Sequence, residues 1–248
     1  MNLLDIPVFR RLIPSLVRRY LIFIKKYKIN INLNNYIFEI DIRESIERKT
    51  YFIREYEKKR MSYLLQTSKR IQSEILIDIG ANIGFYSILL SEYFNVIKSY
   101  EPNIRNFQAL TKNIEKNNLQ KKIQTFNYGL GNKKQILKGN SMTKGELFQT
   151  SGFSLSEKNI EGEEVFINIG DDVLDFKDQI LTIKIDVEGF ELFVVQGIKR
   201  LLENNNCILQ IEIWDKSYEA TNNFLNNLGY KKCASIDGDT YFSNKILS

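Results

Sequence analysis

Residues 74–90 read Glu-Ile-Leu-Ile-Asp-Ile-Gly-Ala-Asn-Ile-Gly-Phe-Tyr-Ser-Ile-Leu-Leu, and this stretch decides the fold. An apolar run breaks at Gly80 and Gly84 and then resumes with the apolar spacing of a helix. Glycine is needed where a backbone bends sharply or where a ligand comes close to it, because a Cβ would block both. The stretch therefore predicts a strand at 74–79, a glycine turn and a helix at 84–94.

An acid, Glu101, ends the next apolar run about twenty positions after the turn. A doubly wound α/β fold places its acceptor for ribose hydroxyls there, so the pattern predicts a cofactor that contains adenosine. The spacing Asp-x-Gly-x-x-x-Gly differs from the G-x-G-x-x-G of dinucleotide sites, and no lysine follows as in a P-loop. An acid two residues before the first glycine suits a ligand that lacks phosphates and carries a cationic amino group, such as S-adenosylmethionine.

The predicted cofactor contacts are Asp78, Gly80, Ala81, Asn82, Gly84 and Glu101. Two interpretations of Asp78 stay open, because its carboxylate could receive the cofactor's amino group or tie the turn to its own backbone amides. Asn82 suits a strained turn, since Asn tolerates a left-handed conformation better than most residues. A turn that serves the fold without any ligand is the alternative.

Strands and helices alternate from residue 74 onward. Apolar runs predict strands at 74–79, 96–101, 123–128, 180–186 and 207–213, and helical spacing predicts helices at 84–94, 103–117, 189–204 and 216–228. This alternation is typical of an α/β fold whose mostly parallel sheet carries helices on both faces. Residues 229–234 and 240–243 predict a C-terminal antiparallel hairpin that closes the sheet.

Three runs resemble one family of enzymes. Residues 77–84 read IDIGANIG, residues 100–103 read YEPN, and residues 183–191 read IKIDVEGFE. In these blocks the chain resembles FkbM-type methyltransferases that depend on S-adenosylmethionine, and the match runs from about residue 51 to about residue 230. The block at 184–189 is the most specific, because generic class I methyltransferases lack it. The resemblance implies a Rossmann-like class I fold, S-adenosylmethionine as the cofactor, and O-methylation of a hydroxyl on a sugar, a glycan or a related metabolite.

The sequence contains no histidine, so a general base must be a carboxylate, a lysine, a tyrosine or a metal-bound group. A sugar hydroxyl is a weak nucleophile whose proton must leave as the new bond forms. The catalytic candidates are the acids near the ends of the fourth and fifth strands, namely Asp186, Glu188 and Glu212. We expect partial burial to raise the pKa of the carboxylate that acts as the base. The alternative is that these acids only fix a loop or order the cofactor, and two neighbouring carboxylates are too few to predict a metal site.

Charged residues also fall within the fourth predicted strand, although a central parallel strand is normally apolar on both faces. Side chains alternate along a strand, so Lys184 and Asp186 share one face, as Gln210 and Glu212 do on the fifth strand. A buried charge destabilises a fold unless it is paired. We therefore expect Lys184 to pair with Glu212 on the neighbouring strand.

Composition narrows the classes of partner that we expect the protein to bind. The net charge of +5 is modest, and no dense basic patch with interleaved aromatics falls in the core domain, so we expect no nucleic-acid partner. Cys207 and Cys233 form neither a metal-binding pattern nor a disulfide framework, which fits a cytoplasmic location. The expected partner is a small-molecule or glycan acceptor, and the oligomeric state stays open. A small metabolite or a protein nitrogen as acceptor, and a non-catalytic module that binds an adenosyl cofactor, are alternatives.

The first 45 residues differ from the rest and predict an appendage to a domain at 46–248. Basic side chains dominate residues 9–28, and apolar residues recur there at helical spacing, so we predict a basic amphipathic helix. It either makes peripheral contact with the inner face of a membrane or packs its apolar side on the domain. No run is long enough to span a bilayer, and no signal-peptide cleavage site follows. Residues 29–42 predict a hairpin that turns at Asn34-Asn35.

Residues 132–178 interrupt the alternation with several glycines, many polar residues and only short apolar stretches. Such an insertion between the third and fourth strands lies near the carboxyl edge of a parallel sheet, where ligands bind. We predict that it recognises the acceptor. A surface β-excursion without that role is the alternative.

Overall fold

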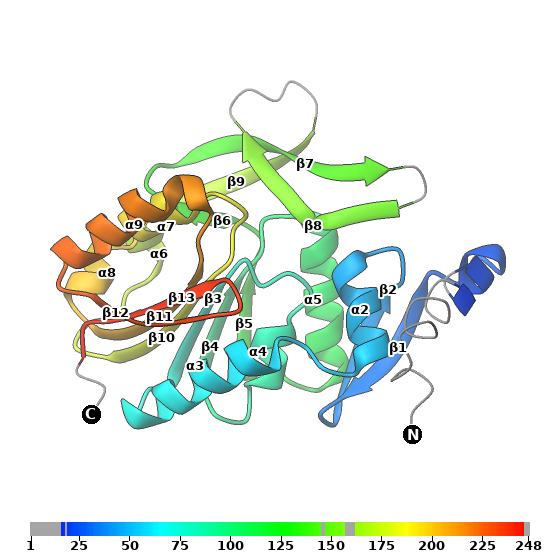
Figure 1. The fold of residues 1–248 in the computed structure, drawn as a ribbon, viewed down its shortest axis with the longest axis horizontal. Helices are drawn as coiled ribbons and strands as arrows, with labels where there is room; N and C mark the ends of the chain where they lie inside the picture. Colours follow the sequence, from blue (N-terminus) through cyan, green and yellow to red (C-terminus); the bar gives the residue numbers. More distant parts are fainter. Residues whose placement is uncertain (1–15, 18, 145–146, 157–161, 246–248) are drawn as a thin grey trace.

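A computed structural model describes residues 16–17, 19–144, 147–156 and 162–245. A seven-stranded sheet lies at its centre, in the order β12-β13-β11-β10-β3-β4-β5 (Figure 1). The strands are β3 (Ile75–Ile79), β4 (Val96–Tyr100), β5 (Ile123–Phe126), β10 (Ile180–Ile185), β11 (Asn206–Glu212), β12 (Lys231–Ile236) and β13 (Asp239–Ser243). The five strands from β11 to β5 are parallel, and β12 and β13 add an antiparallel hairpin at one edge. The predicted α/β class, mostly parallel sheet and C-terminal hairpin are confirmed.

Helices cover both faces of this sheet, because its central strands are apolar on both sides. One face carries α3 (Lys58–Arg70), α4 (Phe85–Leu89) and α5 (Ile104–Lys116), and the other carries α6 (Gly170–Val173), α7 (Glu191–Gly197), α8 (Lys199–Glu203) and α9 (Asp215–Asn227). In β3, Leu76 belongs to the buried cluster that contains Leu64 of α3. Its neighbour Ile77 belongs to the cluster that contains Val194 of α7. Successive residues of one strand therefore support two separate helical layers.

Two predicted helices differ from the observed ones. The helix predicted at 189–204 is divided into α7 and α8 at Ile198. The division follows from packing, because a Cβ on Gly197 would lie 1.9 Å from the backbone oxygen of Gly131. The helix predicted at 84–94 is shorter, since α4 ends at Leu89 and gives way to turns.

The predicted N-terminal hairpin is present as β1 (Lys28–Leu33) and β2 (Tyr36–Asp41). Its turn places Asn34 and Asn35 at φ of 49° and 68°, the left-handed region that asparagine tolerates. Phe38 of β2 is fully buried, and its ring centroid lies 4.9 Å from that of Phe85 in α4. The Asn113 side chain of α5 accepts a hydrogen bond from the backbone of β2 at 2.7 Å. The hairpin therefore shares the core of the main sheet, and α2 (Ser45–Ile53) follows it.

The predicted insertion contains most of a second, four-stranded sheet in the order β6-β9-β7-β8. These strands are β6 (Gly129–Gly131), β7 (Gln135–Lys144), β8 (Leu147–Ser156) and β9 (Glu163–Ile169). β7 pairs antiparallel with β8 and β9, and β9 pairs in parallel with β6 (Figure 1). The segment is thus a β-excursion in its described part. Residues 145–146 and 157–161 of the predicted insertion lie outside the described ranges.

The predicted basic helix is visible only in part. Residues 16–17 and 19–23 are helical and a turn follows at 24–25, whereas residues 9–15 and 18 of the predicted helix lie outside the described residues. In the part of the chain that the structure covers, no helix has the length and apolar character that crossing a membrane requires.

Candidate active site

A cavity of about 470 Å³ opens where the parallel strands end. Its walls come from the glycine turn after β3, the residues after β4 and β10, and the start of the excursion sheet. Residues of α2 and of the segment leading into α3 complete it. Ligands of open α/β sheets bind at this carboxyl edge, and the volume is that of a small-molecule site.

The glycine turn owes its shape to close packing against β10. Gly80 has φ of +82°, and a Cβ there would lie 1.8 Å from the backbone oxygen of Asp186. The backbone amides of Gly80 and Ala81 both donate to the backbone oxygen of Tyr100, which ties the turn to the end of β4. Gly80, Ala81 and Asn82 line the cavity, as the sequence predicts for cofactor contacts.

Gly84 and Asp78 lie behind this wall rather than on it. Gly84 precedes α4 with φ of +95°, and a Cβ there would meet Leu110 at 2.7 Å, so its glycine serves packing. Asp78 is fully buried and accepts a hydrogen bond from the Ser87 hydroxyl at 2.5 Å. Burial raises the pKa of Asp78, and Lys184 opposes that rise. Asp78 therefore stabilises the turn from below, and neither of its two predicted roles matches this contact.

Glu101 borders the cavity and is held firmly by the backbone. Its two carboxylate oxygens accept the amides of Asn82 and Asn103 at 2.8 and 2.9 Å. Burial raises the pKa of Glu101 to about 7, although these two amides act to lower it. A carboxylate oxygen has two acceptor positions, so Glu101 can still accept hydroxyl donors from the cavity side.

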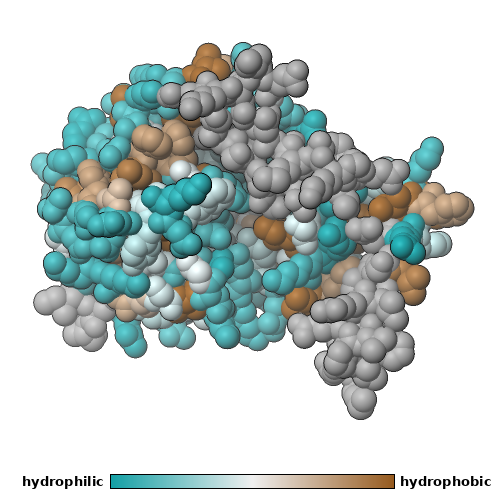
Figure 2. Space-filling model, turned by 45° about the horizontal axis from the view of Figure 1, so that its top comes forward, coloured by the Kyte–Doolittle hydropathy of each residue, from teal (hydrophilic) through white to brown (hydrophobic). Residues whose placement is uncertain are grey.

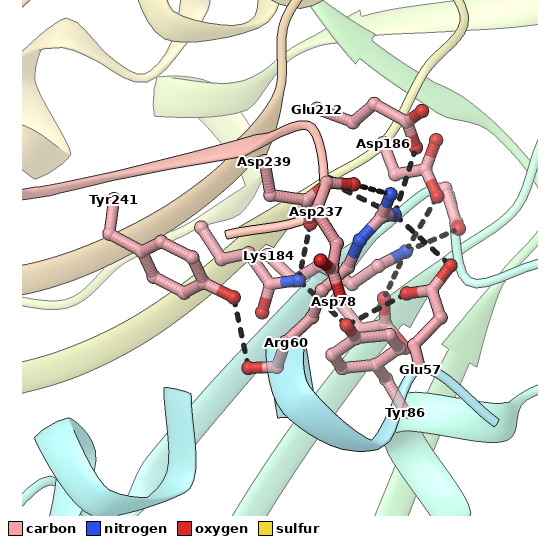
Figure 3. A network of polar contacts seen from close by, with 12 residues as sticks. Glu57, Arg60, Asp78, Tyr86, Lys184, Asp186, Glu212, Asp237, Asp239 and Tyr241 are labelled. Carbon is pink, nitrogen blue, oxygen red and sulfur yellow. Dashed lines mark hydrogen bonds and ion pairs between the residues drawn. The ribbon is translucent and has the colours of Figure 1, made fainter. Parts of the chain in front are cut away.

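Lys184 connects the ends of β3 and β10 beneath the turn (Figure 3). Its Nζ lies 3.3 Å from Asp186 Oδ2, 3.7 Å from Asp78 Oδ1 and 3.4 Å from the backbone oxygen of Gly80. Burial acts to lower the pKa of Lys184, but Asp186 and Asp78 outweigh it and raise that pKa. The ammonium group therefore stays charged inside the sheet and holds both carboxylates in place.

The predicted Lys184–Glu212 ion pair is wrong. The sheet register sets Lys184 beside Asp78 on one side and beside Gln210 on the other, so Glu212 lies two residues further along β11. Glu212 instead approaches Arg60 of α3, with 3.7 Å between Oε2 and Nη1. Burial raises the pKa of Glu212 to about 7.

Arg60 is a member of the site that sequence reasoning missed. Its Nη1 lies 3.2 Å from Glu57 Oε1 and 3.0 Å from Asp239 Oδ1, and its Nη2 donates to the backbone oxygen of Asp237 (Figure 3). Tyr86 completes this network by donating to Glu57 Oε2 at 2.9 Å. The sequence did offer one signal for a polar network here, namely the polar residue Gln210 within an apolar strand. Arg60 itself lies in a helix rich in charged residues, so its surroundings in the sequence do not distinguish it.

Asp186 and Glu188 both line the cavity, as predicted. Asp186 is paired with Lys184, but within the described part of the chain no side chain donates to the Glu188 carboxylate. Burial raises the pKa of Glu188 to about 7, and the nearby Asp186 and Glu191 add to the rise. Glu188 has φ of +52°, a conformation that is strained for a non-glycine residue.

Two other residues of the cavity wall share this left-handed backbone conformation. Asn82 and Glu57, which also line it, have φ of +52° and +38°. Strained backbone is retained where surrounding structure enforces it, and functional sites are where it concentrates.

The far wall is apolar and suits a flat ring. Leu130, Ile167 and Phe190 line it, of which Leu130 belongs to β6 and Ile167 to β9 of the excursion sheet. With Glu101 for ribose hydroxyls and the acids near Gly80 for a cationic group, the lining fits S-adenosylmethionine. Among the residues that the structure describes, no group of three or more His, Cys, Asp or Glu side chains is arranged to hold a metal ion.

Comparisons with known proteins agree with the sequence resemblance. The family described as "Methyltransferase FkbM domain" matches residues 78–232, more than half of the chain. The hexuronic acid methyltransferase AglP of Haloferax volcanii is 27% identical over 145 residues, which cover 56% of this chain and 55% of AglP. The chain thus spans about half the length of this curated relative.

Solved structures with a similar course of the chain include a human methyltransferase 10 domain containing protein. It is 14% identical, with a TM-score of 0.49 over 93% of this chain and 96% of that one. Trm5b from Pyrococcus abyssi is 11% identical, with a TM-score of 0.46 over 88% of this chain and 54% of that one. At such identities the likeness concerns the fold alone.

Proposed function

Because this chain belongs to the FkbM family of methyltransferase domains, we propose that it methylates a hydroxyl group on a sugar, a glycan or a related metabolite. The observation that carries the proposal is the placement of Asp186 and Glu188 on the cavity wall beside Gly80. The relative AglP, a hexuronic acid methyltransferase, adds support for a carbohydrate acceptor.

S-adenosylmethionine, the cofactor of this family, supplies an electrophilic methyl group when it is bound. In this chain Glu101 would accept the ribose hydroxyls, and charge-assisted hydrogen bonds of this kind contribute about 1.5–3 kcal/mol each. Gly80, Ala81 and Asn82 would supply the close backbone wall. Leu130, Ile167 and Phe190 would exclude water from one side, which strengthens every polar contact inside the cavity.

We assign the role of general base to Glu188 ahead of Asp186 and Glu212. Lys184 pairs with Asp186, and Arg60 approaches Glu212, so each of these two carboxylates already faces a cation of the protein. Glu188 has no such cation within 4 Å among the described residues, and its pKa of about 7 suits proton transfer near neutral pH. Glu188 would accept the proton of the acceptor hydroxyl while that oxygen takes the methyl group, whose bond to the donor's sulfonium sulfur breaks as the new bond forms.

The excursion sheet is proposed to recognise the acceptor. Its support is that β6 and β9 already contribute Leu130 and Ile167 to the cavity wall, so the sheet lies next to the bound ligands. The domain division at residue 45 and the absence of a nucleic-acid partner remain predictions.

The decisive experiment offers the purified chain tritium-labelled S-adenosylmethionine with glycan, metabolite, protein and RNA fractions in separate reactions. We expect label in the glycan or metabolite fraction, in a form that resists mild base, because methyl ethers survive base that cleaves methyl esters. Label confined to RNA or to a protein nitrogen would overturn the acceptor class. Binding of the cofactor without label in any fraction would favour the non-catalytic alternative.

A further inference from the structure

The visible part of the N-terminal helix leaves a broad apolar surface uncovered. Leu16, Tyr20 and Phe23 are 61%, 63% and 84% exposed, and Ile24 after the helix is 43% exposed. These residues are spaced at i, i+4, i+7 and i+8, so they share one side of the helix. Isolated exposed apolar residues are common, whereas four on one helical side need an explanation.

This surface is not the side by which the helix rests on the protein. Val17, Leu21 and Ile22 are half-buried and point away from the exposed side by their helical spacing. In Figure 1 the helix lies beyond β1, at the end of the molecule away from the C-terminal hairpin. Of the two alternatives from the sequence, full packing of the apolar side on the domain is wrong for Leu16, Tyr20 and Ile24.

The charge along the sequence of this segment has one sign. Arg19, Lys25 and Lys26 are exposed, and the sequence from 6 to 38 contains no acid at all. Figure 2 shows apolar and hydrophilic residues next to each other at the corresponding end of the molecule. Exposed apolar side chains bordered by basic ones match an anionic bilayer, where the former enter the acyl boundary and the latter face the headgroups.

We propose that residues 16–17 and 19–26 dock on an anionic lipid surface, with Leu16, Tyr20 and Phe23 inserted at the interface. A bilayer offers both an apolar layer and negative headgroups to this segment, whereas a second copy of the chain would bring like charges together. The docking segment continues directly into β1, and the hairpin leads to α2, which contributes Ile46, Lys49 and Thr50 to the cavity wall. The docking surface is therefore joined to the active-site wall through a hairpin that is buried on one face.

The test measures co-sedimentation of the full chain with vesicles of phosphatidylcholine, and with vesicles in which roughly a third of it is replaced by phosphatidylglycerol. We expect strong binding to the anionic vesicles only, weakened by added salt because salt screens the basic residues. Phe23→Asp should lower the vesicle partition coefficient at least about tenfold, because it replaces a ring that inserts into the bilayer by a carboxylate that the anionic headgroups repel.

Matched variants distinguish vesicle binding through this surface from nonspecific binding. Phe166→Asp changes a residue that is 56% exposed on the excursion sheet and should leave vesicle binding unchanged. The pair Lys25→Gln and Lys26→Gln should weaken binding, whereas the pair Lys231→Gln and Lys232→Gln on exposed β12 should not. Cofactor affinity and melting temperature should be those of the parent in every variant.

Three results would overturn the proposal. The first is no preference for anionic vesicles, and the second is an equal loss with Phe166→Asp. The third is a dimer, or a marked loss of melting temperature, that depends on Phe23 in the absence of lipid, because the strip would then be covered by protein. None of these results bears on methyl transfer, which is measured without vesicles.

Discussion

At the scale of single residues, the carboxylates of the site differ in their contacts. Most of them are held by hydrogen bonds or ion pairs with the protein, whereas no residue that the structure describes holds Glu188 in this way. Glu101 is fixed by two backbone amides, and Asp186 by Lys184. Glu188 has a pKa of about 7 and a strained backbone, and no donor among the described residues contacts its carboxylate. This difference is the basis of our proposal that the held groups bind ligands and that Glu188 accepts the proton.

Replacing Glu101 by Ala should weaken binding of S-adenosylmethionine about 10- to 100-fold, which is what losing one or two charge-assisted hydrogen bonds implies. Isothermal calorimetry measures the change. Glu92→Ala, at an exposed carboxylate nearby in the sequence, is the control and should bind normally. Parental affinity in the Glu101 variant would remove this residue from the binding site.

Replacing Glu188 by Gln should lower the single-turnover rate of methyl transfer about 10²- to 10⁴-fold, the range that general-base catalysis contributes. Cofactor affinity should change little, because Glu188 is assigned to the acceptor. Asp186→Asn leaves Lys184 with one carboxylate fewer, so we expect it to weaken cofactor binding as well. An undiminished rate in the Glu188 variant, with a large loss in the Asp186 variant, would transfer the role to Asp186.

The same Glu188→Gln change should stabilise the protein above neutral pH. The pKa of Glu188 is about 7 in the folded protein against an ordinary value of 4.5, so the folded state binds more protons between these values. Stability contributed by this group is therefore lost as pH rises from about 4.5 to about 7. We expect the melting temperature of the variant to exceed that of the parent by a few degrees at pH 8 and to match it near pH 4.5, the ordinary value. Glu219→Gln, at an exposed site, should change neither.

At the scale of elements, sequence patterns predicted those features that residues close together in the chain determine. The strand, glycine turn and helix around Gly80 follow from spacing alone, as does the Asn34-Asn35 turn. The ion pair of Lys184 could not be predicted, because its partner depends on the register between β10 and β3, which are distant in the sequence. The division at Ile198 was missed for the same reason, since Gly197 packs against Gly131.

Two glycines with similar backbone angles should respond differently to alanine. Gly229 has φ of +85° with nothing within 4 Å of a Cβ, so Gly229→Ala should cost only about 1–2 kcal/mol of left-handed strain. Gly80→Ala adds a clash with the backbone of Asp186 and should cost about 1–3 kcal/mol more. Urea unfolding of both variants measures the difference. Equal losses of unfolding free energy in the two variants would mean that the close approach of β10 to the turn is not maintained in solution.

At the scale of the whole molecule, the hairpin predicted as an appendage is built into the core. Phe38 is completely buried and packs near Phe85, which lines the cavity. Its neighbour Ile37 is 42% exposed. The sequence predicted the strands of this hairpin but not its packing, because the contact joins elements that share no local pattern.

Phe38→Ala should therefore lower the free energy of unfolding by about 3–5 kcal/mol, the usual cost of removing a buried aromatic ring. Ile37→Ala, one position away on the exposed side, should cost about 0.5 kcal/mol or less. Chemical denaturation followed by tryptophan fluorescence measures both. Similarly small losses of unfolding free energy in both variants would show that the hairpin folds separately from the sheet. They would then support the predicted boundary at residue 45.

Lys184 and the carbonyl of Gly80 lie 104 positions apart in the chain, yet they meet under the same loop. During synthesis the ribosome releases the loop long before the segment that gives it its final shape. A nascent chain halted ahead of β10 would carry the complete IDIGANIG motif and still fail to retain the methyl donor. Competence for the ligand is thus acquired late in translation, when the second half of the sheet docks onto the first.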